Sequence, residues 1–241
     1  MRKTTAIAFL ALLLLPLGAG AAGGGVPLMH ADVDVSDHAA VQRGAASFVN
    51  YCMGCHSLKY LRYQRLNQDI GIPEETIQEN LIWTPDTMVL DPMTNAMTAQ
   101  QAEAWFGAPA PDLTLSTRRR GEDWVYTYLN TFYGDDSTST GTNNLVLAGA
   151  SMPHVLWRLQ GIPEAEREDG HVVGVRYPEE GATVSEEEYQ AFTNDLVTFL
   201  AYAAEPVRET RQQMGIWVIA FLLVFLVVAI FLKKEYWKDI H

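Results

Sequence analysis

Two cysteines and a histidine lie within five consecutive residues, Cys52-Met53-Gly54-Cys55-His56. A Cys-x-x-Cys-His motif is the attachment sequence of a c-type haem, in which both thiols bond to the porphyrin and the adjacent imidazole binds the iron. The chain has no other cysteines, so no disulfide framework competes for these two. The motif therefore predicts one covalently bound haem c, attached through Cys52 and Cys55, with His56 as the proximal iron ligand.

Two other uses of a Cys-x-x-Cys pair fit this sequence less well. A thioredoxin-like redox pair does not explain His56, and it belongs in an alternating strand and helix pattern that the flanking residues lack. A structural zinc site would need two more ligands at a recognisable spacing, and the sequence offers none.

The N-terminal end of the chain is apolar. Residues 1–21 have the pattern of a secretory signal peptide, with Arg2 and Lys3 before an apolar run and an Ala-x-Ala cleavage site ending at Ala21. Export fits the chemistry of the motif, because bacterial c-type haem is attached outside the cytoplasm.

The C-terminal end carries a longer apolar segment. Residues 213–232 contain the uncharged run from Met214 to Leu232, which would rise about 28 Å as a helix, close to the thickness of a hydrocarbon core. A transmembrane helix here places residues 22–212 in the periplasm and leaves 233–241 as a cytoplasmic tail. The sequence thus predicts a single-pass protein of the bacterial inner membrane.

The charge of the chain excludes some partners. Its 17 basic and 29 acidic residues give a net charge of −12, and five of the basic residues lie in the two terminal segments. The exported domain is therefore more acidic than the whole chain. Such a field repels nucleic acid and favours encounter with a basic soluble redox protein.

Local signals predict a mainly α-helical domain with long loops. Ser36 is a possible N-cap for a helix that runs through Gly44 and Phe48 into the haem motif. Capping boxes begin further helices at Thr98 and Ser185, of which the second ends at Glu205-Pro206. Four other segments have weaker signals: a helix over 122–133, loops over 82–95 and 135–150, and a short hairpin within 170–177.

The sixth iron ligand separates an electron carrier from a catalyst, because a methionine fills the site whereas an open site binds small molecules. Met152 lies in a loop of small residues that ends in Pro153. Met88, Met93 and Met97 lie in the preceding loops. Spacing alone leaves Met152 and these three as competing candidates.

Five segments together resemble the cytochrome c1 family, the haem subunit of the quinol–cytochrome c oxidoreductase (cytochrome bc1) complex. They are the haem motif and its continuation (52–60), Pro-Asp-Leu-Thr (111–114), Arg-Arg-Arg-Gly-Glu-Asp-Trp-Val (118–125), Ala-Gly-Ala-Ser-Met-Pro (148–153) and Ala-Ala-Glu-Pro (203–206). The match spans nearly the whole mature chain.

The resemblance implies a class I cytochrome c-like fold with one C-terminal transmembrane helix, and Met152 as the axial ligand opposite His56. It places a haem-propionate contact on one of the three arginines at 118–120, of which we choose Arg120. The sequence departs from the family pattern at two places nearby. One glycine rather than two precedes Glu122, and Trp124 replaces the usual tyrosine. Residues 141–147 also lack the Asn-Pro-aromatic run that is common before the methionine loop.

The function that the resemblance implies is electron transfer. The domain would carry single electrons from a Rieske iron–sulfur protein to a soluble or membrane-bound cytochrome c, beside cytochrome b in a dimeric complex, with no catalytic site of its own. One alternative is a membrane-anchored cytochrome c that serves another oxidase or reductase. Another is an open-site haem catalyst such as a peroxidase, with Met152 structural and His154 competing for the iron.

Overall fold

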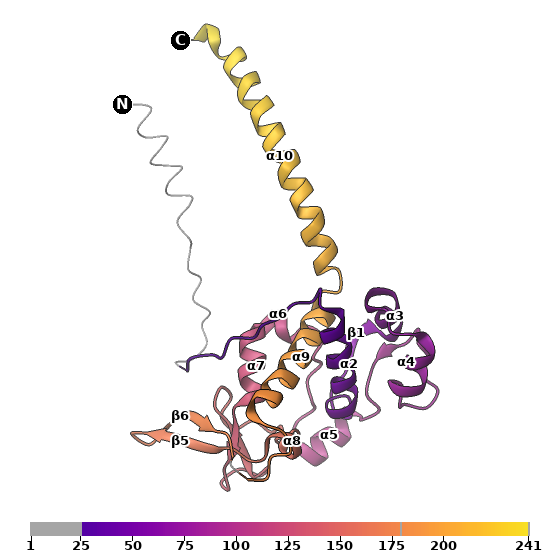
Figure 1. The fold of residues 1–241 in the computed structure, drawn as a ribbon, viewed down its shortest axis with the longest axis vertical. Coiled ribbons are helices and arrows are strands. Elements are labelled where there is room, and N and C mark those ends of the chain that lie inside the picture. Colours follow the sequence, from indigo (N-terminus) through magenta and orange to yellow (C-terminus); the bar gives the residue numbers. More distant parts are fainter. Residues whose placement is uncertain (1–25, 179, 241) are drawn as a thin grey trace.

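The computed structural model describes residues 26–178 and 180–240. The predicted signal peptide, 1–21, lies outside the described residues. A small domain is followed by one long helix that projects away from it (Figure 1). The helices of the domain are α2 (His38–Tyr51), α3 (Tyr63–Ile70), α4 (Glu74–Asn80), α5 (Ala99–Phe106), α6 (Ser116–Arg120), α7 (Glu122–Asn130), α8 (Trp157–Gln160) and α9 (Glu186–Ala204).

The described strands form three two-stranded antiparallel sheets. The pairs are β1 (Leu58–Arg62) with β2 (Pro92–Met93), β3 (Phe132–Gly134) with β4 (Thr142–Asn144), and β5 (Glu164–Glu168) with β6 (His171–Arg176). The mainly helical class is confirmed, and a class I c-type haem domain fits this arrangement.

The core of the domain is the crossing of α2 and α9, which lie side by side in Figure 1. The rings of Phe48 and Phe199 meet with centroids 5.7 Å apart, and both side chains are fully buried. Gly44 lies at the closest point, because a Cβ atom built there would be 2.1 Å from the Asp195 carbonyl oxygen. The predicted contact between the first helix and the last helix of the domain is confirmed.

We expect Gly44→Ala to destabilise the domain by about 3 kcal/mol or more, because the colliding atom is rigid backbone and the two helices must separate. Gly54→Ala is the matched control: a Cβ there has nothing within 4 Å, so its effect should stay within about 0.5 kcal/mol. Thermal unfolding of the detergent-solubilised full chain measures both. Equal stability of the two variants would contradict the close crossing.

Two helix ends differ from the sequence prediction. The N-cap of α2 is Asp37 rather than Ser36: the Asp37 carboxylate accepts from two helix N–H groups, while the Ser36 hydroxyl donates to Asp34. The predicted helix over 122–133 ends at Asn130, because Phe132–Gly134 pairs with β4 instead.

The other local predictions hold with small changes. Thr98 and Ser185 both form complete capping boxes, and α9 ends at the predicted Glu205-Pro206 step. The hairpin exists but begins earlier than predicted, because Glu164–Glu168 pairs with His171–Arg176. The loops over 82–95 and 135–150 contain only the short strands β2 and β4.

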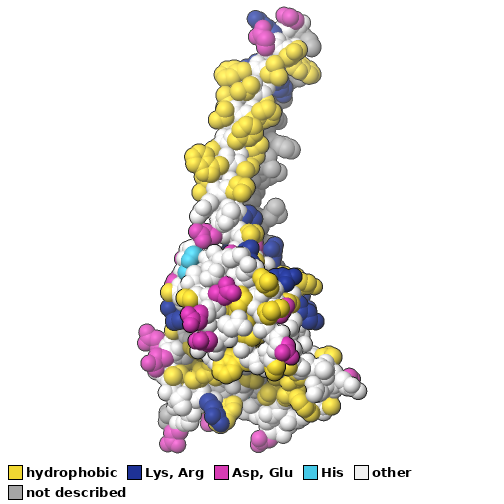
Figure 2. Space-filling view, turned by 90° about the vertical axis from the view of Figure 1, so that its right-hand side faces the viewer, with side chains coloured by type: hydrophobic (Ala, Val, Ile, Leu, Met, Phe, Trp, Pro, Cys, Tyr) yellow, Lys and Arg dark blue, Asp and Glu magenta, His cyan; other side chains and the backbone are white. Residues whose placement is uncertain are grey.

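The C-terminal helix, α10 (Arg208–Tyr236), is 29 residues long and is followed by a short 3-10 turn at Lys238–Ile240. Among the described residues it is the one helix long and apolar enough to cross a membrane. Apolar side chains cover its length in Figure 2. The predicted segment 213–232 lies within it, and the helix begins five residues earlier, at the boundary with the haem domain.

Candidate haem site

The haem motif forms a tight turn at the C-terminal end of α2. The backbone N–H of Cys52 still donates to Phe48 O, and the N–H groups of Cys55 and His56 both donate to Cys52 O, at 3.1 and 2.9 Å. This turn brings both thiols and the imidazole to one end of the helix. Cys52 is buried, whereas Cys55 is partly exposed.

His56 has the protonation and orientation of a metal ligand. Its ring is buried, and its Nδ1 lies 2.8 Å from the Pro111 carbonyl oxygen. Burial lowers the pKa of His56, with Pro111 and then Asp112 opposing it, so the ring is neutral at pH 7. A proton on Nδ1 that donates to a carbonyl leaves the Nε2 lone pair for iron, which is the usual support of a ligating histidine.

The segment Pro-Asp-Leu-Thr (111–114) clasps the haem motif from the other side. Besides the Pro111 contact, Leu113 N–H donates to Ser57 O at 3.0 Å, and the Asp112 carboxylate accepts from Lys59 N–H at 2.9 Å. These contacts join the segment to His56 and to the residues that directly follow the motif. The resemblance in this segment therefore has a structural meaning, namely to orient His56.

Asn95 holds the same turn, and sequence reasoning missed it. Its side-chain amide donates to the Cys55 carbonyl oxygen, and its backbone N–H donates to the Ser57 hydroxyl at 3.0 Å. Asn95 lies in a loop without any motif, so no local signal pointed to it. Only the pairing of Leu58 with Met93 brings it to the turn.

The surroundings of the two thiols do not favour the alternative uses of a Cys-x-x-Cys pair. Burial, with a smaller effect of Cys55, raises the pKa of Cys52 to about 12, and burial also raises that of Cys55, so neither thiol has the lowered pKa of a redox-active pair. Among the described residues, no group of three or more His, Cys, Asp or Glu side chains could hold a metal ion. Two thiols and one buried imidazole at a single turn fit covalent attachment of haem.

Burial places Met93 in the core and leaves both Met97 and Met152 as half-buried candidates. Met93 is fully buried in the core beside β1, and Met53 is buried with its sulfur accepting from the Tyr63 hydroxyl. Met88 lies mostly exposed in a surface loop, and Met97 is half-buried. Met152 is half-buried in the bend between β4 and α8, where its side chain is not part of the core.

Two asparagines hold the Met152 loop at its start. The Asn143 side-chain oxygen accepts from Gly149 N–H at 2.8 Å, and the Asn144 side chain accepts from Val146 N–H and donates to Tyr128 O. These contacts hold the residues before the Met152 loop, where the Asn-Pro-aromatic run is absent. Gly149 takes a left-handed φ of 72° at the turn into the loop.

Two of the three consecutive arginines have different neighbours. Arg118 reaches toward Glu205, with a nitrogen to oxygen distance of 3.8 Å, at the base of α10. The Arg120 guanidinium lies over the Trp124 ring, 4.7 Å from its centroid. Of these two arginines, Arg118 therefore belongs to the junction with the membrane helix, and Arg120 is the better candidate for a propionate contact.

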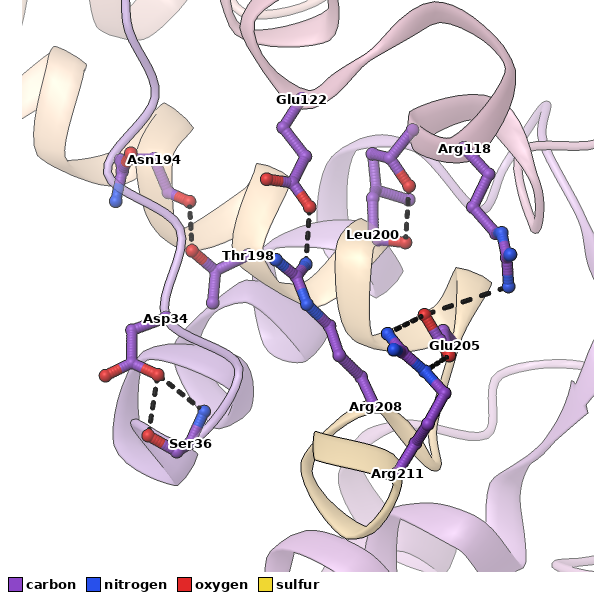
Figure 3. Close-up of polar contacts among 11 residues, drawn as sticks. Asp34, Ser36, Arg118, Glu122, Asn194, Thr198, Leu200, Glu205, Arg208 and Arg211 are labelled. Carbon is purple, nitrogen blue, oxygen red and sulfur yellow. Dashed lines mark hydrogen bonds and ion pairs between the residues drawn. The ribbon is translucent and has the colours of Figure 1, made fainter. Parts of the chain in front are cut away.

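Ion pairs join the haem domain to the start of α10, as Figure 3 shows. Arg208 pairs with Glu122 at 2.6 Å, and Arg211 binds both oxygens of Glu205 at 2.5 and 3.2 Å. Glu122 and Glu205 belong to two of the segments that resemble the cytochrome c1 family. Their role here is to fix the orientation of the membrane helix on the domain.

We expect Glu205→Gln to lower the melting temperature of the full chain at pH 7. The Arg211 hydrogen bonds hold the pKa of Glu205 below its usual value. That stabilisation is therefore complete above the unfolded pKa and is lost as pH falls through the lower folded pKa. The difference from the parent chain should therefore stay constant down to about pH 4.3, the ordinary pKa of glutamate, and should shrink as the pH falls below it.

Glu103→Gln is the control for this comparison. Glu103 is exposed on α5, and its side chain makes no hydrogen bond or ion pair with the described residues. The control should leave the melting temperature unchanged at every pH. A Glu205→Gln effect that persists undiminished at pH 3 would show that the carboxylate charge is not its source.

Comparison with known proteins agrees with this site. The Cytochrome C1 family model matches residues 31–240. A cytochrome c1 of Allochromatium vinosum is 46% identical over the full length of both chains. The ammonia monooxygenase gamma subunit of Nitrosomonas europaea is 44% identical over 96% of this chain and 97% of its own. A cytochrome c1 of Rhodospirillum rubrum is 26% identical over 85% of this chain and 83% of its own.

The family match includes the segments that clasp the haem motif, carry Met152 and meet the start of α10. Its similarity therefore extends well beyond the Cys-x-x-Cys-His motif and includes the membrane-spanning helix. The chain belongs to the cytochrome c1 family of electron-transfer haem proteins.

Proposed function

We propose that this protein is the haem c subunit of a cytochrome bc1 complex, where it passes single electrons from the Rieske iron–sulfur protein to a cytochrome c. The contact of His56 with Pro111 carries the proposal, because it links the haem motif to a second segment within the part of the chain that the family model matches. Haem c, when bound, supplies a one-electron ferric–ferrous couple.

Each proposed site residue has a separate task. Cys52 and Cys55 attach one haem covalently, and the Nε2 atom of His56 is the proximal ligand. Met152 would bind the haem iron together with His56, and its thioether would favour the ferrous state, which suits an acceptor of Rieske electrons. Arg120 neutralises a haem propionate. None of these residues makes or breaks a substrate bond during electron transfer, so the domain alone is a carrier.

The side of the membrane on which the haem domain lies is inferred from the N-terminal residues together with α10. We infer that the haem domain lies in the periplasm and that the segment after α10 faces the cytoplasm, since the N-terminal residues have the pattern of an export signal. Cytochrome b is then the neighbour in the membrane and a second copy of the complex completes a dimer. The net charge of −12 would speed the encounter with a basic cytochrome c.

A second candidate function rests on the Nitrosomonas relative, which is named as a subunit of ammonia monooxygenase. A member of this family can then serve an oxidising enzyme other than a cytochrome bc1 complex. In that case the haem and the membrane anchor remain, and only the partners differ.

Purification of the tagged full chain from native membranes in mild detergent distinguishes the two candidate functions. We expect cytochrome b and a Rieske protein in equal amounts with the haem chain, and quinol–cytochrome c activity in the sample. Recovery of a different oxidase or reductase, with no Rieske protein, would overturn the bc1 proposal and support the second candidate.

A further inference from the structure

The loop that carries Met152 is packed against α7 by a continuous stack of side chains. The rings of Trp124 and Tyr128 are stacked with centroids 5.3 Å apart, and Tyr128 meets the edge of Phe132 at 5.0 Å. Phe132 in turn stacks on His154, with centroids 5.0 Å apart and an angle of 11° between the planes. Because Arg120 lies over Trp124, the stack connects the candidate propionate contact to the methionine loop.

His154 is the end of this stack and is held on several sides. His154 is only 4% exposed to solvent, and Phe132 is only 1% exposed. The His154 carbonyl oxygen accepts from Trp157 N–H at 3.3 Å, which begins the turn into α8. Its Nε2 is one of four buried side-chain atoms without a hydrogen-bond partner in the described chain, and the Gln160 Oε1 is another.

A fixed His154 restrains Met152 through the chain between them. Two residues span at most about 7 Å, and Pro153, which lies between them, has its φ locked by its ring. The Asn143 and Asn144 contacts hold the other side of the loop. Met152 is therefore held on both sides, by the asparagine contacts before it and by the stacked His154 imidazole after it.

We propose that His154 is a positioning residue, which holds the Met152 sulfur at the haem iron by stacking on Phe132, and is not itself an iron ligand. The inference deepens the proposed function and rests on its assignment of Met152. To reach the iron, the His154 ring would have to leave both its stack and its buried site. This role requires the flat ring on Phe132, and the Nε2 atom has no hydrogen-bond partner among the described residues.

The test compares His154→Phe with His154→Ala in the full haem-loaded chain. Phenylalanine keeps a flat ring on Phe132, so the ferric near-infrared sulfur-to-iron band should remain and the ferrous haem should not bind carbon monoxide. Alanine removes the anchor, so the band should fall at least several-fold and carbon monoxide should bind. Phe132→Ala should act like His154→Ala, while His171→Ala, at an exposed histidine of β6, should change nothing.

Covalent haem content and melting temperature, measured in parallel, separate a loosened ligand from an unfolded chain. Loss of the band in His154→Phe would overturn the proposal, because the stack is retained there. An intact band in His154→Ala would overturn it as well. Met152→Leu distinguishes the two assignments: if it keeps the band, the ligand assignment is wrong, and if it loses the band while His154→Ala keeps it, only the positioning role fails.

Discussion

Replacement of Met152 by leucine will leave the haem covalently attached and remove its sixth ligand. Leucine has a similar volume and no sulfur, and Met152 is only half-buried outside the core, so the fold should tolerate the change. The thioether favours ferrous iron, and its loss should lower the haem potential by a few tenths of a volt, within the range of about 0.8 V over which axial ligands act.

Three measurements test the prediction for Met152→Leu. The ferric near-infrared band should vanish, the ferrous haem should bind carbon monoxide, and quinol–cytochrome c turnover by the assembled complex should fail while Rieske reduction persists. Met88→Leu is the matched control, because Met88 is mostly exposed in a surface loop, and it should behave as the parent chain does. An unchanged band and potential in Met152→Leu would move the search for the ligand to Met97, since Met93 is buried in the core.

Removal of either thiol will have an effect as large as that of Met152→Leu. Cys55 is partly exposed, so Cys55→Ala deletes one covalent attachment with little damage to packing. We expect the loss of acid-acetone-resistant haem of normal c-type spectrum and a several-fold fall in the amount of chain in the membrane, because an unattached cofactor no longer stabilises the fold.

Cys52→Ala should be the more damaging of the two, since Cys52 is buried in the core and its removal also leaves a cavity. Gly54→Ala, between the two thiols, should leave the haem attached, because a Cβ there meets nothing within 4 Å. A normal, extraction-resistant haem spectrum in either cysteine variant would contradict covalent attachment at this motif.

The junction with α10 changes the interpretation of the basic residues there. In sequence, Arg208 and Arg211 resemble charges that flank a membrane segment. In the structure both belong to α10 and pair with Glu122 and Glu205 of the haem domain. The Arg208–Glu122 pair is partly buried and the Arg211–Glu205 pair has two hydrogen bonds, so together they restrain the angle between the haem domain and α10 more than isolated surface pairs would.

Features that depend only on residues adjacent in the chain were predictable without a fold. They are the Cys-x-x-Cys-His motif, the apolar run within α10 and the capping boxes at Thr98 and Ser185. The α2–α9 crossing was also expected, and Gly44 is required there because no side chain fits at that distance.

The tertiary structure alone decided what orients these groups. The carbonyl group that holds His56 comes from Pro111, 55 residues away, and the amide of Asn95 that holds Cys55 lies 40 residues away. α7 ends at Asn130 because β4 supplies partners to Phe132–Gly134. The stack of His154 on Phe132 likewise joins separate segments. Hydrogen bonds and ring contacts between distant segments depend on chain topology, so no local sequence pattern predicts them.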